Sequence, residues 1–248
     1  TIDIAPQLTR YRYHDLANED PGIENSPTYY RNLMFFVDNG GTLQCLDINS
    51  MKPVWTYDVG DDTDSSTVIE ETSDGVFLYT ANQVDKRSQV SKKAENCNIR
   101  KFNALTGELV WQRDYSCLYN FYINGGVLGT PLLGKDDISG LIIYTVCFTG
   151  STKDGTLVAL DKETGREVWN RKLSDYSWCS PVGIRSADGK TYGIFTDYAG
   201  IMHLFDPETG KDIDTVSLGR NVESSPSVYN DMIVVGSYAP KIFGIKIK

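Results

Sequence analysis

One ten-residue phrase occurs four times in this chain, and its repetition restricts the possible folds more than any other feature. Each copy has an apolar residue, then Asp or Asn, then a turn that is usually Thr-Gly, and then an alternating segment that usually carries Trp. The Asp or Asn positions are 56, 58 and 45 residues apart, and the copies occupy residues 46–55, 102–111, 160–169 and 205–214. Such a period means that one supersecondary unit is copied, and that no copy can bury its apolar face alone.

Each phrase predicts a hairpin. The Asp or Asn side chain accepts hydrogen bonds from the turn backbone, and Gly adopts the positive φ that a tight reversal needs. In the first copy Ser50-Met51 stands in place of Thr-Gly, so that turn cannot rely on glycine.

A second signature lies upstream of each phrase: a small hydroxyl residue, usually followed by Pro, and then a short apolar run. It occurs at Ser26-Pro27, Ser65-Ser66, Thr130-Pro131, Ser180-Pro181 and Ser225-Pro226. The apolar runs are 33–37, 76–79, 141–148, 192–195 and 232–235. The order predicts four-stranded antiparallel units, with strand A after the hydroxyl, B in the apolar run, C ending at the Asp and D carrying Trp. The fold class expected is therefore an all-β propeller with about five blade repeats.

The two ends of the chain suggest how such a ring could close. Lys241 to Lys246 matches a C strand, and Leu8 to Tyr13 within residues 1–14 reads as a D strand without its own blade. Pairing of Leu8–Tyr13 with Ile242–Lys246 would remove two exposed edges. We expect a single domain over 1–248, with blade repeats at 26–59, 65–115, 130–173, 180–219 and 225–248. The alternative is part of a larger ring of seven or eight blades.

The phrase Asp-x-x-Thr-Gly-x-x-x-Trp, with Gly155 to Asp161 before it and Ser-Pro after it, resembles the repeats of pyrroloquinoline-quinone-like (quinoprotein-type) β-propellers. The resemblance implies that Trp55, Trp111 and Trp169 dock between neighbouring blades. It also implies two possible activities, because this superfamily holds quinone-dependent dehydrogenases and non-catalytic outer-membrane assembly lipoproteins. The dehydrogenases have eight blades, a vicinal Cys-Cys ring and a Ca²⁺ site, whereas Cys45, Cys97, Cys117, Cys147 and Cys179 include no adjacent pair.

Composition excludes several classes of function. A net charge of -9 repels phosphate backbones, so nucleic acid is not expected as a partner. No apolar stretch reaches the roughly 18 residues that a membrane span needs. The cysteine spacing forms no CxxC or zinc knuckle, and core packing is the expected role of the thiols.

Catalytic motifs are missing from the sequence. It contains two histidines, His14 in the terminal segment and His203 in a C strand, where packing between blades is expected. There is no nucleophile elbow, P-loop or His-Glu-x-x-His motif. No catalytic residue, cofactor or metal site is therefore predicted.

The D-to-A connections are the candidate binding surface, because in a propeller they all emerge on one side. They carry aromatic, amide and charged groups suited to sugar rings or extended peptides. The predicted ligand-binding residues are Asn25, Tyr119, Tyr122, Tyr176, Trp178, Arg220 and Asn221.

Two polar segments invite functional interpretations. Asp61 to Asp64 has oxygens suited to Ca²⁺, but it lacks the Gly and Glu of an EF-hand loop, so a solvated acidic turn is expected. The insertion 83–96 carries Lys86, Arg87, Lys92 and Lys93, and reads as a flexible loop or a docking element for an acidic partner.

The sequence thus predicts a non-catalytic binding propeller of bacterial origin, secreted or at the cell surface, and periplasmic in a Gram-negative cell. Its expected partner is a protein, peptide or glycan at the loop face. The alternatives are a fragment of a quinone-dependent oxidoreductase and a carbohydrate-binding domain.

Overall fold

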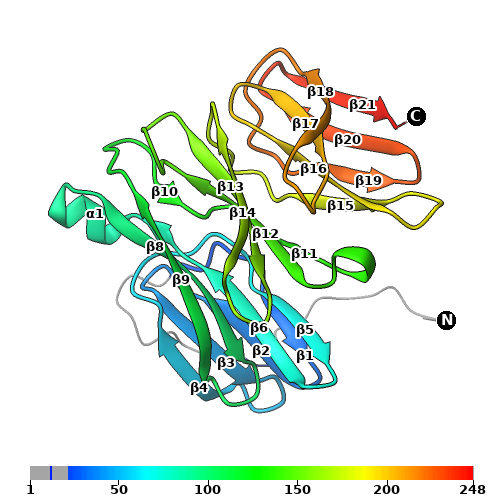
Figure 1. Cartoon of the computed structure of the whole chain (residues 1–248). Coiled ribbons are helices and arrows are strands. Elements are labelled where there is room, and N and C mark those ends of the chain that lie inside the picture. The colour runs from blue at the N-terminus through cyan, green and yellow to red at the C-terminus, as the bar shows by residue number, and fades with distance from the viewer. Residues whose placement is uncertain (1–11, 13–21, 248) are drawn as a thin grey trace, which may run out of the picture.

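The computed structural model describes Arg12 and residues 22–247, which form five antiparallel sheets arranged one after another along an arc (Figure 1). Sheet 1 contains β1 (Thr28–Tyr30), β2 (Leu33–Val37), β3 (Thr42–Asp47) and β4 (Lys52–Asp58). Sheet 2 contains β5 (Val68–Thr72), β6 (Gly75–Ala81), β8 (Glu95–Asn103) and β9 (Leu109–Cys117). Within each of these sheets the strands pair in chain order.

The next three sheets repeat this plan. Sheet 3 is built on β11 (Leu132–Leu133), β12 (Leu141–Cys147), β13 (Gly155–Asp161) and β14 (Glu167–Leu173). Sheet 4 contains β15 (Val182–Arg185), β16 (Thr191–Thr196), β17 (Ile201–Phe205) and β18 (Asp212–Ser217). Sheet 5 contains β19 (Ser227–Tyr229), β20 (Met232–Ser237) and β21 (Lys241–Lys246). β10 (Gly125–Gly126) pairs with β12 and with β7 (Gln83–Val84), so both belong to sheet 3, and α1 (Lys86–Ser91) and η1 (Asp136–Ile138) lie in connections between strands.

These sheets are the blades of a β-propeller, as the sequence predicts. Four of them have the expected A, B, C and D strands, and the apolar run 33–37 coincides with β2. The fifth has its A, B and C strands among the described residues. The proposed closing strand, Leu8–Tyr13, lies outside the described residues apart from Arg12, so ring closure stays a prediction.

A relay of hydrogen bonds joins the innermost strands and explains the hydroxyl signature. The backbone N–H of the hydroxyl residue in one blade donates to the side-chain oxygen of the equivalent residue in the next blade. The four links run from Ser26 to Ser66 (2.9 Å), Ser66 to Thr130 (3.2 Å), Thr130 to Ser180 (2.9 Å) and Ser180 to Ser225 (2.9 Å). In the second blade Ser66, rather than Ser65, makes these contacts.

A second set of contacts joins the outer parts of the blades. The Trp55 indole N–H donates to the Ala104 carbonyl of the next blade at 3.0 Å, and the ring lies against Gly107 in that blade's Thr-Gly turn. Trp111 repeats this arrangement with Lys162 O and Gly165, and Trp169 with Pro207 O and Gly210. We call each such contact a Trp–turn lock. Trp111 is buried, whereas Trp55 and Trp169 are half-buried.

Glycine is required in these turns for two reasons. Gly107, Gly165 and Gly210 have φ angles of 75°, 69° and 72°, which disfavour a side chain. In addition, a Cβ at Gly165 would lie 2.6 Å from the Trp111 ring. The first copy of the phrase places Met51 at the equivalent position with φ 54°, so this turn keeps the left-handed conformation without glycine.

The hydrophobic core lies between successive blades rather than within them. Phe35, Leu43 and Cys45 of blade 1 pack with Leu78 and Phe102 of blade 2, and similar clusters fill the later junctions. Blade 5 buries one face against blade 4 in this way.

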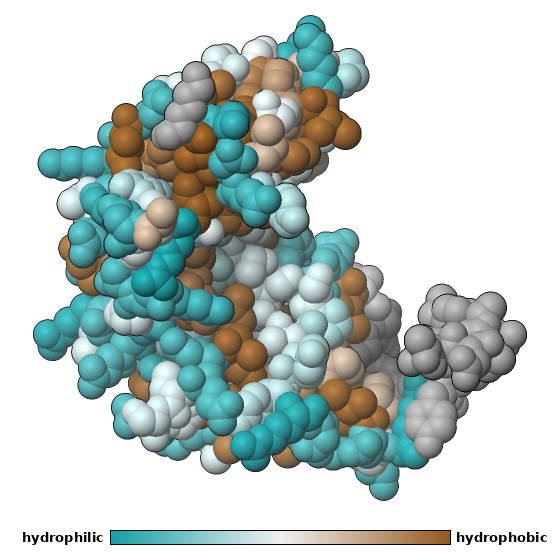
Figure 2. Space-filling view, turned by 90° about the vertical axis from the view of Figure 1, so that its right-hand side faces the viewer, coloured by the Kyte–Doolittle hydropathy of each residue, from teal (hydrophilic) through white to brown (hydrophobic). Residues whose placement is uncertain are grey.

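The other face of blade 5 remains exposed in the described structure. Tyr229, Met232, Val234 and Ile242 are 79%, 37%, 43% and 80% exposed. Figure 2 shows the surface hollowed between the upper part of the molecule, which holds blades 4 and 5, and the lower part, which holds the first blades, with apolar residues gathered on the upper part.

The Trp–turn lock predicts that a methyl group added at its glycine lowers the stability of the protein more than the same change at other glycines with positive φ. Replacement Gly165→Ala should lose about 1 kcal/mol to positive φ and about 1–3 kcal/mol more to the clash with Trp111. Gly219→Ala is the matched control, because Gly219 has φ 80° but open space around its Cβ position. Denaturant unfolding of both variants checks this. Equal destabilisation by the two substitutions would contradict the lock.

The five cysteines are free and buried, as expected for Cys45 and Cys147 from their places in apolar strands and for Cys179 beside the start of an innermost strand. Burial raises the pKa of the thiols, to about 12 for Cys45 and Cys117 and to about 11 for Cys179. Neutral, inaccessible thiols react slowly, because the thiolate is the nucleophile. We therefore expect no fast reaction with a disulfide reagent in the native protein and five reactive thiols after unfolding in guanidinium. Rapid labelling of a thiol in the folded protein would refute this.

Candidate functional site

The direction of the strands determines which connections form the loop face of this propeller. Because the four strands of a blade alternate in direction, the D-to-A and B-to-C connections lie at one end and the A-to-B and C-to-D turns at the other. The B-to-C connections therefore share the face on which sequence analysis placed the ligand site. The largest of them is the segment between β6 and β8, where part of the expected flexible loop forms α1.

The predicted aromatic residues of the third D-to-A connection lie under this face rather than on it. Tyr176 is 4% exposed, stacks on Tyr198 with ring centroids 4.5 Å apart, and meets Phe148 edge to face. Trp178 is half-buried against the same cluster. The cluster also holds Ile123 of the preceding connection, so it anchors neighbouring loops to each other.

The remaining predicted site residues differ in accessibility. Asn25 is buried and its amide donates to Val37 O at 2.7 Å and to Thr63 O at 2.8 Å, which ties the first two blades together. Tyr122 is 87% exposed, Arg220 is exposed, and Tyr119 and Asn221 are half-buried. The structure therefore places Tyr122 and Arg220 where a partner could reach them, and gives Asn25 and Tyr176 structural contacts.

The acidic turn between blades 1 and 2 is not the solvated loop that the sequence suggested. Asp61 is 1% exposed and Asp62 is 6% exposed. The Asp61 carboxylate accepts the backbone N–H of Lys86 at 2.8 Å and pairs with the Arg87 guanidinium at 3.2 Å. The expectation was wrong because the 83–96 insertion folds over this turn, which local sequence could not indicate.

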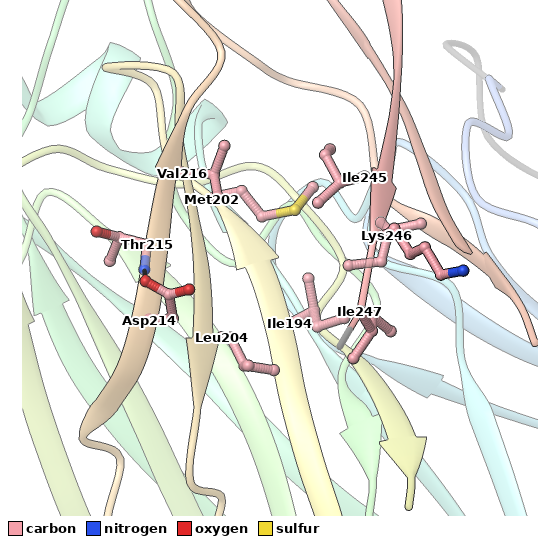
Figure 3. A pocket seen from close by; sticks show the side chains of 10 residues that line it. Ile194, Met202, Leu204, Asp214, Thr215, Val216, Ile245, Lys246 and Ile247 are labelled. Carbon is pink, nitrogen blue, oxygen red and sulfur yellow. Dashed lines mark hydrogen bonds between the residues drawn. The ribbon is translucent and has the colours of Figure 1, made fainter. Parts of the chain in front are cut away.

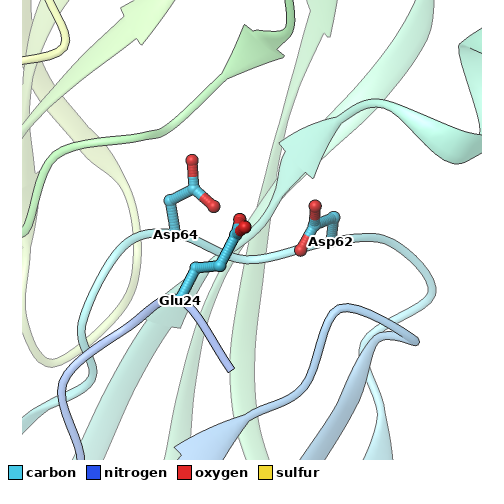
Figure 4. A group of neighbouring side chains, drawn as sticks. All are labelled: Glu24, Asp62 and Asp64. Atoms are coloured by element: carbon cyan, nitrogen blue, oxygen red, sulfur yellow. The ribbon is translucent and has the colours of Figure 1, made fainter. Parts of the chain in front are cut away.

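Three carboxylates meet beside this turn (Figure 4). Glu24, Asp62 and Asp64 come from two successive connections, and their oxygens lie within 4.8 Å of one another. Burial is the main cause that raises the pKa of Asp62 to about 6 and that of Asp64 to about 7; nearby carboxylates add to it. Oxygen clusters of this kind are stabilised by protons or by a hard cation such as Ca²⁺. The sequence did not indicate this group, because Glu24 is 38 residues from Asp62.

The raised pKa values make the stability of this region depend on pH. The unfolded chain titrates its Asp residues near pH 3.9, so the folded state binds more protons between pH 4 and 7. The stabilising contribution is therefore full below about pH 4 and is lost as pH rises through 6 to 7. We expect Asp64→Asn to raise the melting temperature by about 2–4 °C at pH 7.5 and to change it less at pH 4.

The control for this experiment is Asp74→Asn, because Asp74 lies exposed in the β5–β6 turn. Thermal unfolding of both variants at the two pH values gives the comparison. A melting temperature of the Asp64→Asn protein that shifts equally at both values would show that the cluster does not retain protons on folding.

A cavity of about 210 Å³ lies between blades 4 and 5 (Figure 3). At this junction the fourth phrase has Asp214 in the position of Trp55, Trp111 and Trp169. No indole fills the junction, so apolar side chains of both blades line an open hollow. The lining consists of Ile194, Met202, Leu204, Val216, Ile233, Ile245 and Ile247, with Asp214, Thr215 and Lys246 beside them.

His203 has a structural environment, in agreement with its expected place between blades. Its Nδ1 lies 3.0 Å from Asp212, its Nε2 lies 3.3 Å from Asp197, and its ring stacks on Phe195 at 4.4 Å. Arg171 of blade 3 pairs with the same Asp212 at 2.5 Å. His203 therefore helps to join blades 3 and 4 through Arg171 and contacts the B-to-C connection of blade 4 through Asp197. His14 lies outside the described residues.

Comparison with known proteins agrees with this architecture. The family model described as "Outer membrane protein assembly factor BamB" matches residues 95–192 and 153–247, which together make more than half of the chain. The chain belongs to this family of pyrroloquinoline-quinone-like repeats. The resemblance inferred from the Asp-x-x-Thr-Gly-x-x-x-Trp phrase is confirmed.

Relatives of more than one kind are similar to this chain. Outer membrane protein assembly factor BamB of Kangiella koreensis is 26% identical over 172 residues, which cover 56% of this chain and 43% of that protein. Quinoprotein ethanol dehydrogenase of Pseudomonas aeruginosa is 26% identical over 185 residues, 67% of this chain and 25% of the enzyme. The chain thus spans less than half the length of either relative.

The crystal structure of BamB from Moraxella catarrhalis has the same fold as the present chain. The TM-score is 0.61 and the identity 17%, over 91% of this chain and 61% of that one. Among the described residues of the present chain, no helix is long and apolar enough to cross a membrane.

The residues of the described loop face do not fit a planar quinone cofactor. The resemblance implies a vicinal cysteine pair beside the cofactor, and the five cysteines are separate from one another and fully buried. Tyr176, one of the aromatic residues predicted for this face, already has Tyr198 stacked against its ring.

Proposed function

We propose that this chain is a non-catalytic interaction propeller that works outside the cytoplasm in the assembly of outer-membrane proteins. The observation that carries the proposal is the loop face itself, where exposed side chains such as Tyr122 and Arg220 project from blades that are locked together beneath them. Rigid scaffolds with accessible loops are typical of binding surfaces. The relatives named as assembly factors support the same activity.

The partner proposed is a protein or an extended peptide. The exposed groups of the loop face combine an aromatic ring with a guanidinium, and Tyr and Arg are the residue types that contribute most at protein interfaces. A glycan is the second candidate partner, since an exposed ring such as that of Tyr122 can also stack on a sugar. A periplasmic location is compatible with the cysteines, because buried thiols are protected from oxidation in that compartment.

A quinone-dependent oxidoreductase is the alternative function, and similarity to quinoprotein ethanol dehydrogenase is the observation that favours it. The two functions separate in one assay. Under the binding proposal, the purified chain supplied with pyrroloquinoline quinone and Ca²⁺ develops no bound-quinone absorbance and reduces no dye with an alcohol.

The binding proposal predicts a face-specific loss of affinity. We expect the soluble periplasmic part of an outer-membrane assembly protein from the same bacterium to bind this chain in calorimetric titration. Arg220→Ala combined with Asn221→Ala should weaken binding about tenfold, as for other interface anchors. The control is Lys211→Ala, because Lys211 is exposed in a C-to-D turn on the opposite face. Absence of binding together with quinone-dependent dye reduction would replace the proposal by the enzyme alternative.

A further inference from the structure

Helix α1 and the connection after β9 meet at the loop face, although 30 residues separate their contacting side chains. The Tyr119 hydroxyl donates to Gln89 Oε1 at 3.4 Å. The Lys92 ammonium lies 5.2 Å from the centre of the Tyr119 ring and 5.8 Å from that of Phe121. Two segments that sequence analysis treated separately therefore form one surface, and α1 protrudes from the body in Figure 1.

Large apolar groups are unusually accessible on this surface. Phe121 is 65% exposed and Tyr122 is 87% exposed, and their rings meet edge to face with centroids 5.1 Å apart. On α1, Val90 is 86% exposed. These side chains are held on a supported loop, because Ile123 and Leu128 pack into the aromatic cluster below. Exposed rings at the end of an anchored loop are typical of a binding site.

The charge of the surface is opposite to that of the protein as a whole. The segment from Lys86 to Lys93 carries Lys86, Arg87, Lys92 and Lys93 and no acidic residue, on a chain of net charge -9. Arg87 is engaged with buried Asp61, which leaves the three lysines to face solvent or a partner. The local positive potential attracts carboxylates, and the aromatic rings beside it can stack on further rings.

We propose that this aromatic–cationic surface, formed by α1 and residues 118–124, binds an acidic polypeptide segment that carries aromatic side chains. The proposal rests on the proposed function, since it names the partner chemistry of one region of the same loop face. Carboxylates of the segment pair with Lys92 and Lys93, and its rings pack against Phe121 and Tyr122. A narrow polypeptide is favoured over an anionic bilayer because Glu24, Asp62 and Asp85 form one electrostatically coupled acidic group at the start of the helix, which repels an extended negative plane.

A random copolymer of Glu and Tyr is a direct probe of this surface. We expect it to bind the wild-type chain, as measured by fluorescence anisotropy, with an affinity that falls about tenfold or more between 50 and 200 mM salt, as for other charge-driven binding. Lys92→Glu combined with Lys93→Glu should weaken binding at least tenfold, and Phe121→Ala about threefold to tenfold.

Two matched variants control for charge and for exposed aromatic area. Lys52→Glu combined with Lys211→Glu makes the same change of charge at exposed positions in or directly after C-to-D turns on the opposite face. Tyr229→Ala removes an aromatic side chain that is 79% exposed on β19. Both should bind the copolymer as the wild type does, and circular dichroism with thermal unfolding shows which variants keep the fold.

The proposal is overturned if the copolymer does not bind, if the control variants weaken binding as much as the surface variants, or if polyglutamate binds as well as the copolymer. Binding to vesicles of anionic lipid without binding to the copolymer would also overturn it, in favour of a membrane surface. The assembly-protein titration distinguishes the two proposals, because its dependence on Arg220 and Asn221 is measured independently of Lys92 and Phe121.

Discussion

The contact between a tryptophan and the turn of the next blade is the interaction on which this structure depends. It combines a large buried ring, a hydrogen bond from the indole N–H to a backbone carbonyl, and a glycine whose missing side chain leaves room for the ring. Trp111 supplies the ring from one blade and Gly165 supplies the turn from the next, so neither blade can form this contact by itself. The repeat can therefore be read as a series of junctions whose halves lie in different copies of the phrase.

The hydroxyl relay does for the inner strands what the Trp–turn locks do for the outer ones. A serine or threonine side chain is short, so its oxygen meets the neighbouring backbone only if the innermost strands approach closely. At the first three junctions the two contacts hold neighbouring blades together at their inner and outer ends, and the apolar clusters fill the space between them. This explains why the loop face can hold exposed rings without losing its shape.

Sequence alone predicted the parts of this protein that depend on local or repeated chemistry. The turn phrase specified the hairpins, and the apolar run 33–37 matched β2 without adjustment. Residues whose surroundings come from distant segments were harder to interpret. The sequence suggested a solvated acid at Asp61, but α1 covers this residue. It suggested a ligand contact at Tyr176, but Tyr198 stacks on this ring.

Helix α1 gives the same lesson at the level of secondary structure. Six residues are too few for a helical periodicity to appear in sequence, and an isolated helix of that length is unstable. It forms because Asp61 accepts its first backbone N–H groups and binds Arg87. The pairing of its Lys92 with Tyr119 and Phe121 could not be inferred from sequence, because two strands intervene.

Asp214 gives the junction between blades 4 and 5 a different physical character from the other three. In a repeat protein, stability is approximately the sum of intrinsic repeat stabilities and nearest-neighbour terms, so the weakest interface limits how far cooperativity extends. With a carboxylate where the others have an indole, this interface forgoes a buried ring and leaves a hollow of about 210 Å³. Blade 5 is accordingly the part of the fold best placed to open independently. Its amide protons would then exchange with solvent while blades 1 to 4 stay closed.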